Sequence, residues 1–293
     1  MAGERLVYFG HHKCATQYIK AVVKHMADWL GLTFEAVDRP VDLPETGADG
    51  ALRHRLHLKH KGFVEPTADI LYFANANAAA IAALTERGDY RGFHVIRDPR
   101  DIVVSGYFSH LHSHPITEYN SKQMSAWREQ LAAAALEEGL LLELGFEAEN
   151  FANLRGWDYT NPQVLELRYE GLIDDPLAAF TQAFAFWGLS SPRLGLPTLA
   201  ALAVDRWRQK RAGRPMPRRE SLPAPLLRHI VTRNAFERKA GGRSQGEEDA
   251  RHHYRKGVAG DWRNHFTPRV TAAFKDRYGD LLVALGYETS LDW

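Results

Sequence analysis

The chain has 293 residues, of which 37 are basic and 36 acidic, and 45% are hydrophobic. The formal net charge of +1 excludes a strongly cationic surface, so bulk attraction to nucleic acid or to anionic lipid is not expected. Any anion must therefore be bound locally. The length allows one large α/β domain or two smaller domains.

Cysteine content indicates a reducing compartment, and hydropathy indicates a soluble protein. Cys14 is the single cysteine, which excludes an intramolecular disulfide and a multi-cysteine zinc site. No apolar segment approaches the ~18 residues needed to span a bilayer, and the first residues lack the pattern of a secretory signal. We expect a soluble, cytoplasmic protein that does not bind membranes.

Short β-type runs alternate with helical patterns from the first residues to about residue 187. The predicted strands are residues 5–9, 69–74, 92–96 and 163–168, and the predicted helices are 16–30, 76–84, a helix from about 101, and 174–187. This alternation is typical of a parallel sheet covered on both faces. Ligands of such sheets bind at the carboxyl ends of the strands.

The remaining segments predict helices and a proline-rich region. Residues 122–154 are rich in Ala, Leu and Glu, and further helices are predicted at 198–210, 225–239 and 268–285. We expect a single domain over residues 1–293, with a helical insertion at about 120–157 and a lid-like region at about 190–260. The basic stretch 206–219 would belong to that lid, although a patch for an acidic acceptor and a solvated face are open alternatives.

Residues 10–16 (GHHKCAT) join the first predicted strand to the first predicted helix. Backbone N–H groups and the helix dipole point at whatever lies in such a loop, and Lys13 and the Thr16 hydroxyl would complete a phosphate or sulfate site. The pattern GxxxxGK[ST] is absent, which disfavours hydrolysis of ATP or GTP. The simpler alternative is a strand-to-helix turn with a surface lysine.

Two further motifs combine positive charge with a helix or loop. In RDPRDIVVS (97–105), Asp98 and Pro99 predict a helix start, so Arg97 ends a strand and Ser105 lies on the helix. A guanidinium and a hydroxyl placed in this way can hold a phosphate monoester. In RKG (255–257), charge is combined with an exposed backbone N–H. Taken alone, the second motif is better explained as a surface ion pair and the third as a solvated basic run.

Together and in this order, the three motifs resemble those of the sulfotransferases that use 3′-phosphoadenosine 5′-phosphosulfate (PAPS). Lys13 and Thr16 match the family's Lys-Ser-Gly-Thr-Thr phosphosulfate loop, RDPRDIVVS its 3′-phosphate motif, and RKGVAGDWRNHFT (255–267) its C-terminal motif. Tyr169-Glu170 resembles a pair whose tyrosine contacts the adenine. The resemblance implies an α/β, P-loop-like three-layer fold with a central parallel sheet flanked by helices.

The resemblance also implies PAPS as co-substrate, adenosine 3′,5′-bisphosphate (PAP) as product, and no metal. It assigns nucleotide binding to the loop, to the second motif with the adenine tyrosine, and to the third motif: His12, Lys13, Cys14, Ala15, Thr16, Gln17 and Tyr18; Arg97, Ser105 and Tyr169; Arg255, Lys256 and Gly257. Ala15 replaces the family's glycine, and we expect a negative φ there because a side chain disfavours positive φ. His252 and His253 lie among acidic residues without a regular ligand spacing, so no metal site is predicted there.

In this family the acceptor attacks sulfur in line, which requires positioning and charge stabilisation. Lys13 would meet the charge on the leaving oxygen, and a histidine would take the proton of the acceptor. The segment RLHLKHK (55–61) corresponds to the family's Lys-Thr-His segment, so we predict His60 as the base, His57 as the alternative, and Lys59 as a second contact to the phosphosulfate.

The sequence leaves the acceptor and the oligomeric state open. A small molecule or a carbohydrate with a hydroxyl or amine would fit, nucleic acid is not expected, and a homodimer is allowed. Two alternative functions remain at this stage: a nucleotide-binding module of the same fold without catalysis, and a P-loop-type kinase.

Overall fold

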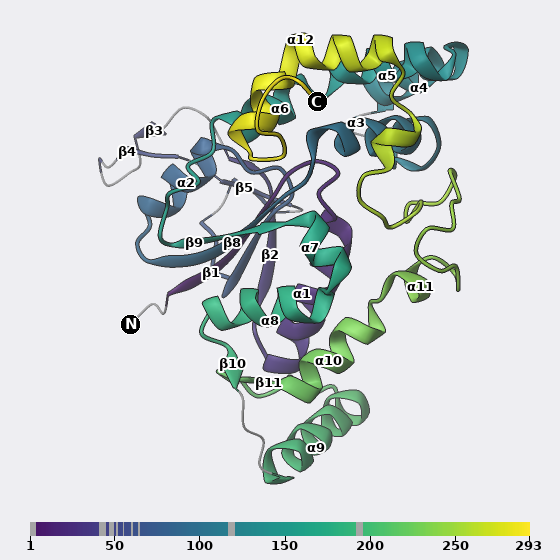
Figure 1. The fold of residues 1–293 in the computed structure, drawn as a ribbon. Helices are drawn as coiled ribbons and strands as arrows, with labels where there is room; N and C mark the ends of the chain where they lie inside the picture. The colour runs from purple at the N-terminus through teal and green to yellow at the C-terminus, as the bar shows by residue number, and fades with distance from the viewer. Residues whose placement is uncertain are drawn as a thin grey trace. The chain divides into compact units, whose positions relative to one another are not determined.

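The computed structural model describes residues 4–40, 45–46, 50, 52–54, 56–59, 61–63, 65–116, 121–191 and 196–293. Its helices and strands are labelled in Figure 1, and the chain contains two compact units. Unit 1 comprises Met1–His11, Ala15–Ile96 and Trp157–Asn234, and unit 2 comprises His12–Cys14, Arg97–Gly156 and Ala235–Trp293.

Unit 1 is built on a seven-stranded sheet of order β6-β5-β2-β7-β1-β8-β9. Its strands are β1 (Arg5–Gly10), β2 (Phe34–Pro40), β5 (Leu56–Leu58), β6 (Gly62–Phe63), β7 (Ile70–Phe73), β8 (Tyr90–Ile96) and β9 (Val164–Arg168). The five strands from β2 to β9 pair in parallel, and β5 and β6 pair antiparallel. The predicted central parallel sheet is therefore confirmed.

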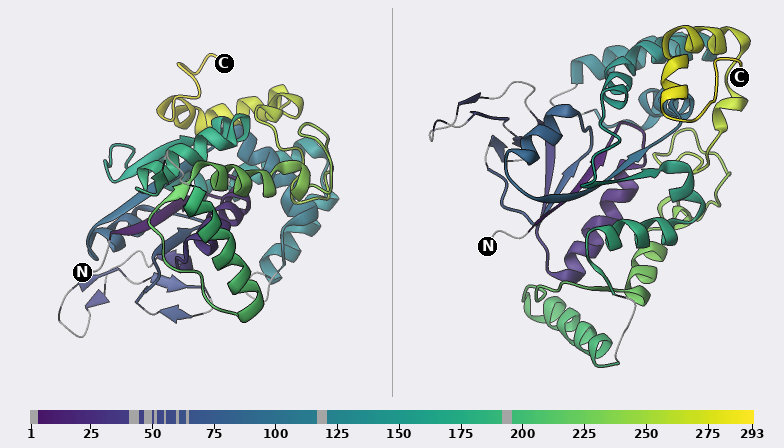
Figure 2. Two further views of the ribbon diagram at one scale, coloured as in Figure 1. Left: turned by 90° about the horizontal axis from the view of Figure 1, so that it is seen from below. Right: turned by 60° about the vertical axis from the view of Figure 1, so that its left-hand side comes forward.

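Helices cover both faces of this sheet, so unit 1 has three layers (Figure 2). Side chains alternate along β1: Leu6 and Tyr8 pack on one face, and Val7 and Phe9 on the other. The first face is covered by α1 (Thr16–Leu30), α7 (Tyr169–Asp174), α8 (Pro176–Phe186) and α10 (Ala224–Arg233), and the second by α2 (Ala78–Thr85). The central strands β1, β7 and β8 are mostly buried because helices shield them on both sides.

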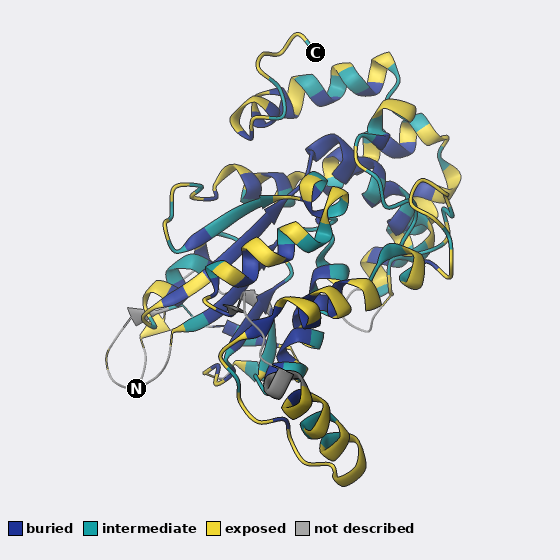
Figure 3. Ribbon diagram, turned by 60° about the horizontal axis from the view of Figure 1, so that its bottom comes forward, coloured by how far each residue is buried: buried dark blue, intermediate teal, exposed yellow. Residues whose placement is uncertain are grey.

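The smaller elements of unit 1 lie outside this sheet. They are the pair β3 (Glu45–Thr46) and β4 (Leu52–Arg53), the pair β10 (Ser190–Ser191) and β11 (Leu222–Pro223), and α9 (Leu196–Ala212). Most described residues of α9 are exposed (Figure 3). In the basic stretch, Arg206 pairs with Asp28 of α1, and Arg219 pairs with Asp205. These ion pairs hold the stretch within unit 1, and its role as a lid stays a prediction.

Unit 2 is helical. It consists of α3 (Pro99–Phe108), the π-helix η1 (Ser109–Ser113), α4 (Ser121–Ala133), α5 (Leu136–Phe146), α6 (Ala148–Arg155), α11 (Phe236–Lys239), the 3-10 helix η2 (Asp261–Asn264) and α12 (Pro268–Ala284). An aromatic cluster joins α6 to α12, with ring centroids of Phe151 and Tyr278 at 4.7 Å, and the Tyr278 hydroxyl donates to the Leu144 carbonyl of α5. Among the described residues, no helix combines the length and apolarity that a bilayer crossing requires.

The four strands predicted from sequence are present to within two residues at each end. The helix predicted at 174–187 is present as α8, which begins at Pro176 because Asp175 caps it by accepting the N–H of Ala178. The helix predicted at 225–239 is divided into α10 and α11, with Asn234 at the end of α10. Strand β2 was not predicted, whereas β5 lies where apolar and polar residues alternate in the stretch 55–61, as in an edge strand.

Candidate functional site

The loop between β1 and α1 has a backbone that only a few residue types adopt readily. Lys13 has φ of 62° and Ala15 has φ of 58°, both in the left-handed region. The expectation of a negative φ at Ala15 is therefore wrong. Each non-glycine residue in this conformation costs about 1–2 kcal/mol, because Cβ crowds the carbonyl oxygen. Such strain is typical of functional sites, where the surrounding structure imposes the conformation.

Lys13 and Arg97, predicted from separate motifs, lie together in unit 2. Arg97 Nη1 donates to the Lys13 carbonyl at 3.1 Å, and its Nη2 is 4.0 Å from the Asp101 carboxylate. Burial lowers the pKa of Lys13 to about 8, partly opposed by Glu147 and Glu143, while Arg97 and Arg255 lower it further. Lys13, Arg97 and Arg255 therefore lie close enough to repel one another. An anion bound among these three predicted cations would offset that repulsion.

The start of α3 is fixed as the sequence predicts. Asp98 caps the helix by accepting the N–H of Arg100, and Pro99 follows in the first turn. The buried Arg100 guanidinium pairs with Asp98 and Glu288 and lies 4.0 Å from the ring centroid of Trp262. Arg100 and Trp262 are therefore structural anchors, and Ser105 is half-buried on the same helix.

The third motif is attached to α3 by a residue that sequence analysis did not single out. The buried Asp101 carboxylate accepts the backbone N–H of Gly260 at 2.6 Å and that of Trp262 at 2.9 Å. Burial raises the pKa of Asp101, although Arg97 and the two N–H groups act in the opposite direction. The sequence signal for this role was the position of Asp101 in the second motif, four residues after Arg97.

The predicted phosphate ligands of this third motif share a carboxylate. Arg255 Nη2 and Lys256 Nζ donate to the Asp261 carboxylate at 2.5 and 2.6 Å. These hydrogen bonds outweigh the effect of burial and lower the pKa of Asp261. Gly257 has φ of 68°, and a Cβ there would lie 2.6 Å from the Phe236 ring, so glycine is required.

Two buried carboxylates on α5 and at its C-terminal end were also missed. Glu143 and Glu147 are one helical turn apart and fully buried. Burial and the neighbouring Glu147 raise the pKa of Glu143 well above its usual value. Gly106 of α3 makes room for the pair, because a Cβ there would lie 2.3 Å from Glu143 Oε1.

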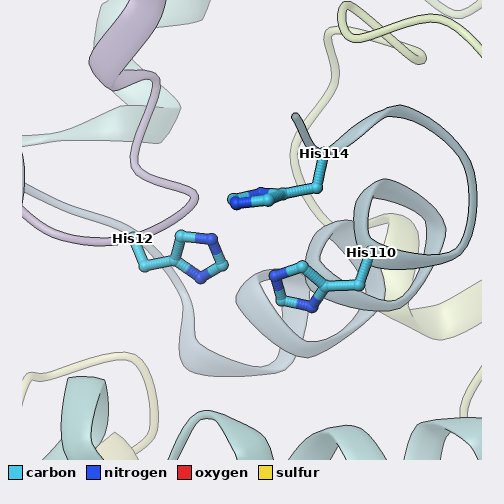
Figure 4. A group of neighbouring side chains, drawn as sticks. All are labelled: His12, His110 and His114. Atoms are coloured by element: carbon cyan, nitrogen blue, oxygen red, sulfur yellow. The ribbon is translucent and has the colours of Figure 1, made fainter. Parts of the chain in front are cut away.

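Three histidines gather beside these carboxylates (Figure 4). His12 follows β1 in the loop, His110 belongs to η1, and His114 follows η1; one ring nitrogen of each lies within 4.8 Å of the others. Burial lowers the pKa of His110, and burial also lowers the pKa of His114 to about 4. Both imidazoles are therefore neutral at pH 7. The sequence showed the histidines of HLHSH but not their meeting with His12.

A family model for the sulfotransferase domain matches residues 85–286, which is more than half of the chain. The chain belongs to the sulfotransferase family. The match includes the second and third motifs and begins after the loop at 10–16, so the assignment of that loop stays a prediction. No curated protein matches the chain.

A solved sulfotransferase structure shares this fold. Mouse sulfotransferase SULT7A1, complexed with PAP, has a TM-score of 0.54 at 14% identity, over 95% of this chain and 84% of that one. Retinol dehydratase in a complex with retinol and PAP has a TM-score of 0.48 at 16% identity, over 95% and 81%. The first similarity supports the three-layer fold that the sequence predicted.

The remaining family residues lie in unit 1. Tyr18 packs against Phe180 with centroids 5.7 Å apart, Thr16 accepts a hydrogen bond from Tyr72 at its carbonyl, and Tyr169 is nearly buried at the start of α7. Gln17 is exposed. Their roles in binding the nucleotide stay predictions.

The predicted base of the sulfotransferase reaction, His60, lies outside the described residues. The alternative, His57, lies on β5, with its ring 4.9 Å from that of Phe63. Lys59 is exposed after β5, and its backbone N–H bonds the Ala36 carbonyl at 2.8 Å. The choice between His57 and His60 therefore stays a prediction.

Unit 1 also contains a buried polar network that the sequence did not reveal. His94 Nδ1 lies 2.6 Å from Glu166 Oε2, and Trp157 donates to Glu166 Oε1 at 2.8 Å. Burial lowers the pKa of His94 to about 3 and raises that of Glu166 to about 7. The ring of His11, at the end of β1, lies 4.9 Å from that of His94.

Proposed function

We propose that this protein transfers the sulfuryl group of PAPS to a hydroxyl or amine of an acceptor by in-line attack. The observation that carries the proposal is the meeting in unit 2 of cations from three motifs, with Arg97 bonded to the Lys13 backbone and Arg255 close enough to lower the pKa of Lys13. A nucleotide with a 5′-phosphosulfate and a 3′-phosphate has the negative charge to match this cluster.

In the proposed step, the acceptor oxygen or nitrogen forms a bond to sulfur while the bond from sulfur to the bridging oxygen of the 5′-phosphate breaks. The electron pair leaves with PAP, and Lys13 stabilises the charge on the leaving oxygen. His60, or alternatively His57, takes the proton of the acceptor, and Lys59 is a second contact to the phosphosulfate.

The 3′-phosphate is assigned to Arg97 and Ser105 of the second motif and to Arg255, Lys256 and Gly257 of the third. Arg97 and Arg255 offer planar donor sets that suit a phosphate. Gly257 has a positive φ and no side chain that would cover its backbone N–H. The loop residues His12 to Tyr18 and the adenine contact Tyr169 complete the proposed nucleotide site. The lone Cys14 fits action in the cytoplasm.

Calorimetry with PAP and with AMP tests the donor. We expect PAP to bind at least about tenfold more tightly than AMP, because charge-assisted hydrogen bonds to the 3′-phosphate contribute about 1.5–3 kcal/mol each. Arg97→Ala should remove most of that difference, and Arg269→Ala, an exposed arginine of α12, should preserve it. Equal affinity of the wild-type protein for PAP and AMP, or no binding of PAP, would contradict the proposal.

Sulfate transfer from labelled PAPS to a panel of hydroxylated small molecules and sugars tests the reaction. Once an acceptor is found, replacement of the base should lower turnover by about 10²–10⁴-fold. His60→Ala and His57→Ala are compared, and the larger loss identifies the base. Unchanged turnover in both variants would remove this histidine pair from the mechanism.

A further inference from the structure

The three histidines in unit 2 are arranged as ligands of a metal ion. Ring centroids of His12 and His110 are 5.0 Å apart, those of His110 and His114 5.0 Å, and those of His12 and His114 5.8 Å. One nitrogen of each ring lies within 4.8 Å of the other two. Figure 4 shows the three rings turned toward a common point.

Two of the three rings are oriented by carboxylates. His12 Nδ1 lies 2.7 Å from Glu147 Oε1, and His110 Nδ1 lies 2.7 Å from Glu143 Oε1. When Nδ1 donates to a carboxylate, the lone pair of Nε2 is available for a metal ion. A carboxylate behind each ligating imidazole is the usual outer shell of a protein zinc site.

His110 provides a second, independent sign of a ligand. Its side chain is 1% exposed, and among the described residues its Nε2 has no hydrogen-bond partner. An unpartnered polar atom in this position costs about 1–3 kcal/mol. A metal ion bound at Nε2 would remove this cost.

The backbone that carries His110 and His114 is held firmly. The His114 N–H bonds the Ser109 carbonyl at 2.6 Å, which closes the π-turn and places both rings on one side. Arg128 of α4 donates to the carbonyls of His110 and His114 at 2.9 and 2.7 Å. Short π-helical turns are frequent at functional sites.

We propose that His12, His110 and His114 bind a zinc ion and leave its fourth position open. Three neutral nitrogen ligands with one exchangeable position are typical of catalytic zinc sites. Binding draws the nitrogens together to about 3.3 Å, the separation set by Zn–N bonds of about 2.0–2.1 Å in a tetrahedron. This inference departs from the expectation of a metal-free site.

The location of this ion gives it a role in sulfuryl transfer, and this part rests on the proposed function. His12 directly precedes Lys13 in the loop assigned to the phosphosulfate. An acceptor hydroxyl bound at the open position would lose its proton more readily, because zinc lowers the pKa of a bound oxygen acid. The ion would then assist the histidine base rather than replace the nucleotide cations.

Equilibrium dialysis of the untagged full-length chain with zinc tests the site. We expect one zinc ion per chain, and binding weakened at least about tenfold in His110→Ala and in the more exposed variant His114→Ala. His112→Ala is the matched control, because His112 lies on the same π-helix but outside the three-histidine group. Cobalt should give the visible absorption of a tetrahedral site in the wild-type protein and in His112→Ala only.

Two outcomes would overturn the zinc site. One is the absence of stoichiometric zinc and of the cobalt spectrum in the folded wild-type protein, and the other is equal zinc binding in wild type and His114→Ala. Circular dichroism checks the fold of each variant. Calorimetry with PAP on zinc-free protein is run in parallel, so loss of the zinc site and failure of the nucleotide proposal are read separately.

Discussion

Asp101 and Gly260 are 159 residues apart in sequence and are joined by a hydrogen bond of 2.6 Å from the Gly260 backbone N–H to the Asp101 carboxylate. The same carboxylate accepts the N–H of Trp262. The helix that begins in the second motif therefore holds the segment that follows the third motif. Loss of this carboxylate should affect both stability and nucleotide binding.

Asp101→Ala tests this connection. The variant leaves two backbone N–H groups without their charged acceptor, so we expect the free energy of unfolding to fall by about 3 kcal/mol. PAP affinity should fall about tenfold or more, because Arg255 and Lys256 lose their fixed position. Chemical denaturation and calorimetry give the two quantities, with the exposed Asp276→Ala as control. Wild-type affinity for PAP in the variant would contradict this role.

Lys13 should set the upper pH limit of nucleotide use. Burial lowers its pKa to about 8, so the ammonium is present below that pH and is lost above it. The value of kcat/KM for PAPS reports on the free enzyme and should therefore decline as the pH rises through about 8. Lys13→Arg keeps the charge at all accessible pH values and should move the decline upward. A decline at the same pH in Lys13→Arg would assign it to another group.

Ala15→Gly should stabilise the protein. Its φ of 58° is strained for alanine and free for glycine, and we expect a gain of about 1 kcal/mol in the free energy of unfolding. The same replacement inside α1, Ala21→Gly, should lower the free energy of unfolding by about the same amount, because glycine in a helix interior is less stable than alanine. Thermal unfolding of the two variants would show shifts of opposite sign, and a destabilised Ala15→Gly would contradict the strain.

Glu166→Gln should change how stability depends on pH. Burial raises the pKa of Glu166 from 4.5 to about 7. The contribution of the protonated carboxyl to the free energy of unfolding is therefore fully present below pH 4.5 and is lost as the pH rises through about 7. Glutamine imitates the protonated acid and still accepts from Trp157. The free energy of unfolding of the variant, relative to that of the wild type, should therefore rise by about 2 kcal/mol between pH 4.5 and 8. Denaturation across this range measures the difference, and a constant difference would contradict the raised pKa.

Much of the fold could be predicted because it depends on local sequence. The Asp-Pro pair at 98–99 predicts the start of α3, and the same pair at 175–176 starts α8. Strand β2 carries polar residues and little period-two alternation, so its place in the sheet follows from pairing with β7 and β5. Such pairing overrides weak local preference.

The sequence by itself determined the family, the three cationic motifs and the alternation that gives a parallel sheet, because these depend on residue type, order and spacing. Only the tertiary structure decided which residues meet. It brought Asp101 to Gly260, Glu143 to His110, and His12 to His114, and it gave Ala15 a positive φ. Contacts between residues far apart in sequence, and the burial that shifts their pKa values, depend on packing and leave no fixed spacing in the chain.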